Sequence, residues 1–275
     1  MGKGMKLLGV VVVLLLVGAG NPASAQLTKD ENLSRFDDRP LHFGFYLGLN
    51  TMDYRFAHYN DLTQNPVVSA QGSSFMADAD KKFYNGVHSY RVESYPLKPG
   101  FTVGGVINLR MNKGVDFRFT PGMSLGSRQL LFTDNISQYM KSTTNGGILY
   151  PGLTYERYTT TPSAYIDIPF GFRYKGFRSG NLRPYIYGGA AYRRDLESKR
   201  ISESVLHLNR NGYYAEVAFG IDTYFPYFRF TGEFKYSCGL NNLLNFDVSA
   251  TNPPYYSYVL KSLKSNIFTL IFYFE

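Results

Sequence analysis

The chain has 275 residues and a formal net charge of +8, and 17% of its residues are aromatic, as 24 Tyr and 22 Phe with no Trp. A mean hydropathy of −0.22, with no long apolar run after the first twenty-odd residues, excludes a helical membrane protein. The basic residues are scattered singly, so no nucleic-acid partner is expected. Cys238 is the single cysteine, which excludes an intrachain disulfide.

Residues 1–25 have the pattern of a secretory signal peptide. Lys3 and Lys6 precede an apolar run at 7–17, and a small-x-small cleavage site follows at 23–25. The alternative, an uncleaved membrane helix, is weaker because the run is shorter than the roughly 20 residues that a span needs. No cysteine lies near the cut, so lipoprotein processing is excluded. We therefore expect the mature chain to begin at Gln26, with a periplasmic N-terminal segment at 26–40.

From residue 41 onward, alternating side chains predict eight strands. They lie at 41–57, 100–111, 115–131, 162–176, 183–194, 213–225, 228–239 and 263–275. The connections are short at 111–114, 176–182 and 225–227, and long at 58–99, 132–161, 195–212 and 240–262. An even number of strands with alternating short and long connections is typical of transmembrane barrels, which have short periplasmic turns and longer extracellular loops.

The last strand carries the strongest indication of a lipid environment. Phe268, Leu270, Phe272 and Phe274 lie on one face of it. A water-soluble edge strand with such a face would promote aggregation, whereas lipid accommodates it. We expect these four side chains to face lipid. The predicted fold is an all-β, eight-stranded antiparallel transmembrane β-barrel at 41–275, located in the outer membrane.

The opposite faces of the strands carry charges. We expect ten residues to form a charged network in the lumen: Arg110, Asp116, Arg118, Asp167, Arg173, Glu216, Asp222, Arg229, Glu233 and Lys235. This network is either the satisfied polar interior of a closed barrel or a gate or proton path. Because eight strands leave an interior just wide enough for side chains, a general diffusion porin is not expected. A soluble sandwich or lipocalin-like barrel also alternates, but it would bury its apolar face and leave its charged face wet.

The long connections are rich in tyrosine, a residue that is enriched at protein interfaces. Six tyrosines are candidates for contact with a partner: Tyr90, Tyr95, Tyr155, Tyr158, Tyr255 and Tyr256. The alternative is that these segments extend the hairpins beyond the membrane, and the two roles are compatible.

No motif indicates chemistry. His42, His58, His88 and His207 stand in no metal-binding or nucleophile-activating pattern, so no catalytic, metal or cofactor site is expected. Small barrels can be lipid-modifying enzymes, and Ser202, Ser204 and His207 offer a weak candidate for that activity. Their spacing on a loop is not a motif, which favours a non-enzymatic protein.

Three segments carry a resemblance to a known family. Arg39-Pro-Leu-His-Phe-Gly-Phe-Tyr-Leu-Gly-Leu-Asn50, entered from Phe36-Asp-Asp38, stands with Ile168-Pro-Phe-Gly-Phe-Arg-Tyr174 and the ending Phe272-Tyr-Phe-Glu275. Together they resemble the PorT family, called SprT in gliding bacteria. Its members are outer-membrane barrels of the Bacteroidota that belong to the type IX secretion system. The resemblance implies a role in export, with other secretion components and outer-membrane lipid as partners. A structural or adhesive barrel outside that system is the alternative.

Overall fold

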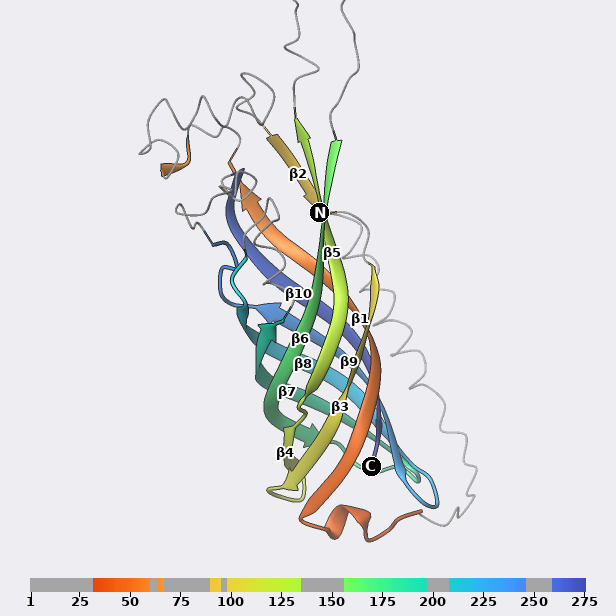
Figure 1. Ribbon diagram of the computed structural model, residues 1–275. Coiled ribbons are helices and arrows are strands. Elements are labelled where there is room, and N and C mark those ends of the chain that lie inside the picture. The colour runs from red at the N-terminus through yellow and green to blue at the C-terminus, as the bar shows by residue number, and fades with distance from the viewer. Residues whose placement is uncertain are drawn as a thin grey trace, which may run out of the picture. The chain divides into compact units, whose positions relative to one another are not determined.

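The computed structural model describes residues 32–59, 64–66, 90–94, 98–134, 156–196, 208–245 and 259–275 (Figure 1). One sheet of ten antiparallel strands contains most of them, which confirms the all-β prediction. After the short helix η1 (Phe36–Asp38), the strands are β1 (Leu41–His58), β2 (Tyr90–Ser94), β3 (Pro99–Arg110), β4 (Val115–Phe119), β5 (Gly122–Asp134), β6 (Glu156–Lys175), β7 (Leu182–Asp195), β8 (Asn211–Tyr224), β9 (Arg229–Gly239) and β10 (Leu260–Phe274). No helix among the described residues is long and apolar enough to cross a membrane.

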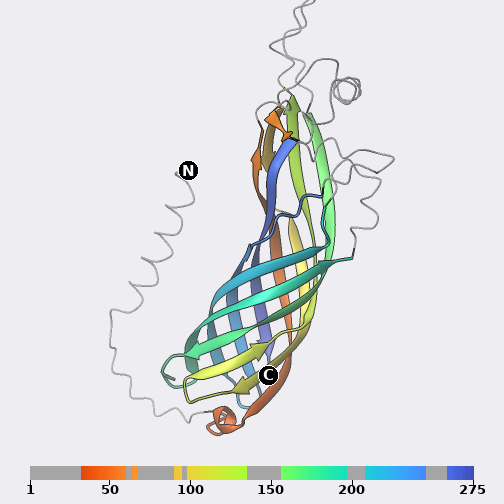
Figure 2. The same cartoon turned by 90° about the vertical axis from the view of Figure 1, so that its left-hand side faces the viewer.

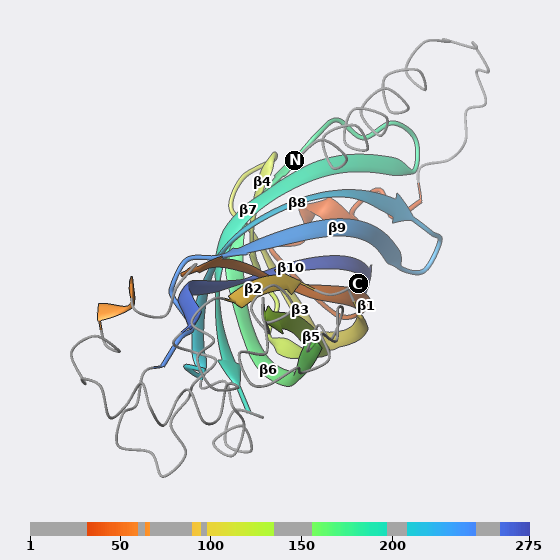
Figure 3. The same ribbon diagram turned by 90° about the horizontal axis from the view of Figure 1, so that it is seen from above.

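The strands pair around a ring. β1 pairs with β10 from Phe45↔Phe274 onward, and its other edge pairs with β3 from Leu41↔Leu109 to Thr51↔Pro99. Between them the order runs β10, β9, β8, β7, β6, then β4 and β5, then β3. Figure 3 shows β7, β8, β9, β10 and β1 following one another around the wall, and Figure 2 shows that they cross it obliquely. Beyond Thr51, β1 pairs with β10 alone in the described chain, so the closure is partial.

The count of ten strands differs from the eight predicted because two positions of the ring each hold two strands. β4 and β5 both pair with β6 and with β3, and the predicted strand 115–131 is divided between them at Thr120-Pro121. Pro121 has no N–H to donate to the ladder, which explains the break. The second such position holds β2 and β3, which both pair with β5. β2 lies inside the predicted loop 58–99 and pairs with the part of β5 that extends beyond β3, from Ser94↔Leu130 to Tyr90↔Asp134.

Most predicted bounds are within three residues of the observed strands, and the largest difference is at the start of β6. This strand begins at Glu156 rather than at 162, because β5 and β6 stay paired out to Thr133↔Glu156. In Figure 1, β2, β5 and β6 reach beyond the other strands. The predicted short turns at 111–114, 176–182 and 225–227 are confirmed, and Gly180 takes the positive φ of +58° that the middle turn requires.

The two faces of the wall are apolar outside and charged inside. On β9, Arg229, Glu233 and Lys235 are buried, whereas Phe234 between them is 55% exposed. The other exposed apolar side chains follow the same alternation on β1, β6 and β8. A water-soluble barrel would show the reverse arrangement, so the lipocalin-like alternative is wrong.

Candidate functional site in the barrel lumen

Nine of the ten residues predicted for the lumenal network are buried, and one lies at its margin. Asp116, Arg118, Asp167, Arg173, Glu216, Asp222, Arg229, Glu233 and Lys235 have almost no exposed surface. Arg110, the last residue of β3, is partly exposed and pairs at 3.2 Å with Asp38, which is mostly exposed. Arg110 is therefore outside the buried network, because it lies at the end of β3, where the N-terminal segment leads into β1.

Glu233 accepts contacts from three strands. Its Oε2 is 2.8 Å from Arg118 Nη1 and 2.5 Å from the Tyr185 hydroxyl, and its Oε1 is 2.9 Å from the Tyr273 hydroxyl. Lys235 Nζ lies 3.4 Å from the same carboxylate. The Arg118 guanidinium lies 4.5 Å from the centre of the Tyr273 ring. Such a carboxylate has partners for both oxygens, so this cluster ties β4, β7, β9 and β10 together across the lumen.

A second cluster joins Arg173 to the chain end. Arg173 pairs with Asp222, which also accepts a hydrogen bond of 2.7 Å from the Thr231 hydroxyl. Arg229 pairs with the Glu275 side chain and lies 3.9 Å from Asp222. Glu275 was not among the predicted lumenal residues, although the outward alternation of Phe268, Leu270, Phe272 and Phe274 places it on the inward face.

A third cluster is centred on Arg193, which was not predicted. Its Nε lies 3.1 Å from Asp167, and its Nη2 lies 2.6 Å from Glu216 and 3.1 Å from the Ser237 hydroxyl. Arg193 follows Tyr185, Tyr187 and Ala191 at even spacing, so the phase of β7 was readable in principle. Residues 188–191 are all glycine or alanine, so they show no alternation between polar and apolar side chains. The inward face of β7, and with it Arg193, was therefore missed.

The buried charges of the described chain balance. The cations are Arg118, Arg128, Arg173, Lys175, Arg193, Arg229 and Lys235, and the acids are Asp116, Asp167, Asp195, Glu216, Asp222, Glu233 and, by its side chain, Glu275. Lys175 and Asp116 form a further pair at 2.8 Å. With seven charges of each sign the lumen is nearly neutral, and each of these cations except Arg128 forms an ion pair with one of the acids.

Residues 32–40 form a cap at one end of the lumen. Phe36 stacks on His42 at 4.3 Å, and the Asp37 carboxylate accepts hydrogen bonds from Arg183 at 3.0 Å and Tyr224 at 2.8 Å. Burial raises the pKa of Asp37, but the Tyr224 hydroxyl and the charges of Lys175, Arg229 and Arg183 lower it by more, so its pKa lies below the ordinary 3.8. The cap is thus held by charge-assisted hydrogen bonds that need an ionised carboxylate.

The cap has a second attachment at Asn32. Its backbone N–H donates to Asn181 at 2.9 Å, and its carbonyl accepts from Arg178 at 2.5 Å. Arg178 also lies 3.9 Å from the centre of the Tyr224 ring. The cap therefore contacts the short turn between β6 and β7 through Asn32, and the beginning of β7 and the end of β8 through Asp37.

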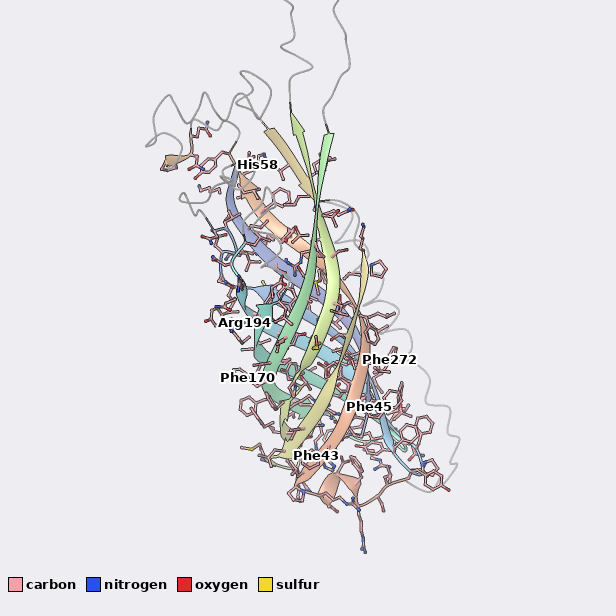
Figure 4. All side chains as sticks on the ribbon, in the orientation of Figure 1. Phe43, Phe45, His58, Phe170, Arg194 and Phe272 are labelled. Atoms are coloured by element: carbon pink, nitrogen blue, oxygen red, sulfur yellow. The ribbon has the colours of Figure 1, made fainter. Side chains whose placement is uncertain are left out.

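The four side chains predicted to face lipid on the last strand all point away from the lumen. Phe268 and Leu270 are exposed, and Phe272 and Phe274 are partly covered by stacking on rings of β1 and β9. Phe274 lies 5.0 Å from Phe45 between ring centres. Figure 4 shows Phe43, Phe45, Phe170 and Phe272 on the outside of the wall.

Most of the candidate partner-contact tyrosines lie outside the described residues. These are Tyr95, Tyr155, Tyr255 and Tyr256, and the same holds for Ser202, Ser204, His88 and His207. Tyr90 opens β2 opposite Asp134, and Tyr158 lies in β6 opposite Leu131, so both belong to strands rather than loops. Their contact role stays a prediction. Within the described ranges, no group of three or more His, Cys, Asp or Glu side chains could hold a metal ion.

Comparisons with known proteins place this architecture. Residues 24–245 match the family model described as "Outer membrane protein beta-barrel domain". Two solved structures are similar in outline: OprG of Pseudomonas aeruginosa, with 9% identity, TM-score 0.36 and coverage of 84% of this chain and 92% of that one, and the outer membrane protease OmpT of Escherichia coli, with 11% identity, TM-score 0.33 and coverage of 90% and 96%. No curated protein matches the chain.

Proposed function

We propose that this chain, which belongs to the outer membrane protein beta-barrel domain family, supports protein export by the type IX secretion system without being the conduit. The protein is an outer-membrane β-barrel. Its proposed role is that of an accessory, which assembles or stabilises a larger translocon through its extracellular segments or its lipid-facing wall.

One observation carries the part of the proposal that concerns the conduit. The buried Arg118 on β4 reaches across the lumen to Glu233 on β9, and the buried Arg173 on β6 reaches past β7 to Asp222 on β8. Arg229 is also buried in the lumen and pairs with its cross-strand neighbour Glu275. Moving a folded protein through this space would require separating these ion pairs, and a buried charge that loses its partner costs about 3–5 kcal/mol. The filled lumen therefore supports a role outside the transport path.

The link to type IX secretion is supported by the sequence resemblance alone. Most of the most specific resembling segment, residues 39–50, forms the first part of β1, which pairs with both β3 and β10 where the ring closes. Its outward side chains Phe43, Phe45 and Leu49 are well exposed. In an accessory protein, this wall is a candidate surface for contact with another barrel as well as for lipid.

Deletion of the gene in its native host tests the proposal. Secreted and surface proteins would be compared by mass spectrometry with and without a plasmid-borne copy. We expect collective loss of cargo with a C-terminal secretion signal and its accumulation in the periplasm. An unchanged profile would discard the type IX role and leave a structural or adhesive barrel or a lipid-modifying enzyme.

Two further measurements separate the remaining alternatives. Affinity capture of the tagged protein under gentle detergent is expected to recover other secretion components, and their absence counts against the accessory role. Ser204→Ala and His207→Ala are expected to leave the lipid profile of the outer membrane unchanged. An altered profile in either variant would instead indicate a lipid-modifying enzyme.

A further inference from the structure

Arg128 on β5 differs from the other buried cations of the lumen. Its side chain is 98% buried (2% exposed), yet no carboxylate within the described ranges forms an ion pair with it. Its Nη2 donates to the Tyr165 hydroxyl at 2.7 Å and contacts the Met52 sulfur at 3.4 Å, while its Nε has no partner. A buried guanidinium without a counter-charge is costly, so a site of this kind calls for an anion.

The same level of the lumen holds hydroxyl groups without partners. Four of them, on Tyr54, Ser163, Tyr214 and Ser265, are buried and form no hydrogen bond in the described chain. In the charged clusters nearer the cap, most of the unpartnered atoms belong instead to guanidinium and carboxylate groups that already form ion pairs, with the Tyr187 hydroxyl as an exception. Each buried, unsatisfied donor costs about 1–3 kcal/mol. Several donors around Arg128 are therefore left without an acceptor in the described chain. The buried carboxylate of this level, Asp195, lies opposite Tyr165 but forms no ion pair with Arg128.

These groups lie together around Arg128. The centres of the Tyr54 and Tyr165 rings are 5.0 Å and 5.1 Å from its guanidinium carbon. Ser265 is the direct cross-strand partner of Tyr54. Tyr214 packs in one cluster with Met52 and Tyr165, both of which contact Arg128. The donors thus come from β1, β5, β6, β8 and β10 and converge on one level.

We propose that this level is a binding site for a small oxyanion, of the carboxylate or phosphate class. The guanidinium supplies the charge and a free N–H, and the tyrosine and serine hydroxyls supply neutral donors, the combination that recognises an oxyanion. Water could satisfy the hydroxyls but could not neutralise Arg128. Because these donors are buried on the lumenal face, opposite the exposed apolar side chains of the wall, the ligand is a free anion rather than the headgroup of a membrane lipid.

The test is calorimetric titration of the purified full-length mature protein in detergent. Inorganic phosphate and acetate are the two probes, each titrated into chloride buffer. We expect saturable binding of one equivalent of at least one probe, and which of them binds identifies the class of oxyanion. Arg128→Met should weaken this binding about tenfold or more, since hydrogen bonds to charged groups are lost. Tyr54→Phe and Tyr214→Phe should each weaken it severalfold.

Two variants provide matched controls. Arg194→Met removes a positive charge from the outer face of β7, where Arg194 is exposed and paired with Ile166, and it should bind as the wild type does. Tyr192→Phe removes a hydroxyl that donates to Asn211 outside the lumen, and it should also bind normally. Circular dichroism and heat-modifiable migration would establish that each variant is folded.

The proposal is overturned if neither anion binds the wild type, or if Arg128→Met binds as tightly as Arg194→Met does. If Arg128→Met does not fold, Arg128→Lys replaces it. This variant keeps the charge but loses the forked donor, and it should bind more weakly than the wild type. Wild-type affinity in a folded Arg128→Lys would equally contradict an oxyanion site built on the guanidinium.

Discussion

Arg118 and Glu233 form a 2.8 Å ion pair across the lumen in which the two side chains are 1% and 0% exposed. Their strands, β4 and β9, are not neighbours in the sheet. The pair therefore spans the interior of the ring rather than reinforcing one ladder of backbone hydrogen bonds. The contribution of this ion pair to the free energy of unfolding can be measured directly.

Glu233→Gln is expected to destabilise the barrel by about 3–5 kcal/mol, because it leaves Arg118 buried without its carboxylate. Urea-induced unfolding in lipid vesicles would measure the loss. The double variant Arg118→Met with Glu233→Gln should be less destabilised than Glu233→Gln alone, since it removes the unpaired charge. Equal destabilisation of the two variants would contradict a buried ion pair of this strength.

Gly220→Ala should destabilise the barrel by about 1–3 kcal/mol through overpacking. A Cβ atom at this inward position of β8 would overlap the Tyr185 ring, whose hydroxyl donates to Glu233. The matched control is Gly232→Ala on β9, where a Cβ atom meets nothing within 4 Å. We expect unfolding in urea to separate the two variants clearly, and similar midpoints would argue against the packing of Tyr185 over Gly220.

Asp37→Asn should loosen the cap formed by residues 32–40. The folded-state pKa of Asp37 lies below 3.8, because the Tyr224 hydroxyl and nearby cations outweigh its burial. Ionised Asp37 therefore stabilises the cap above the ordinary carboxyl pKa, and this contribution is lost as the pH falls through the lower, folded-state value. At neutral pH we expect the free energy of cap opening to fall by about 1–3 kcal/mol in the variant.

Hydrogen exchange of residues 32–40, followed by mass spectrometry, would measure this opening. The difference between wild type and Asp37→Asn should shrink once the pH is below 3.8. Asp38→Asn is the control, because the Asp38 side chain is 73% exposed and its pair with Arg110 is a surface contact of small effect. A difference that persists unchanged to the lowest pH would exclude Asp37 as the titrating group.

Phe234→Arg places a charge on the outer face of β9, where Phe234 is 55% exposed among other apolar side chains. A cation in the apolar band of a membrane barrel costs about 2–4 kcal/mol, and less near its margins. Reversible folding into vesicles would measure this cost. Tyr227→Arg is the control, because Tyr227 is 93% exposed in the short turn between β8 and β9. If both variants fold with equal stability, the outer face of β9 does not contact lipid.

The strands with strong contrast between faces were predictable. In β9, Arg229, Thr231, Glu233 and Lys235 alternate with Phe230 and Phe234, so both the strand and its inner face can be predicted from the sequence. β5 shows the limit of this approach. Ser127, Arg128 and Gln129 are consecutive polar residues, which hides the phase of the strand and with it the buried Arg128.

The sequence by itself determined the fold class, the positions of most strands and the division into an apolar and a charged face. It could do so because alternation along a strand is a local property with a period of two residues. Only the tertiary structure decided which charges meet, as Arg193 does with Asp167 and Glu216, and as Arg229 does with Glu275. These partners depend on how the strands are staggered around the ring, and that stagger is set by closure of β1 on β3 and β10 rather than by any single segment.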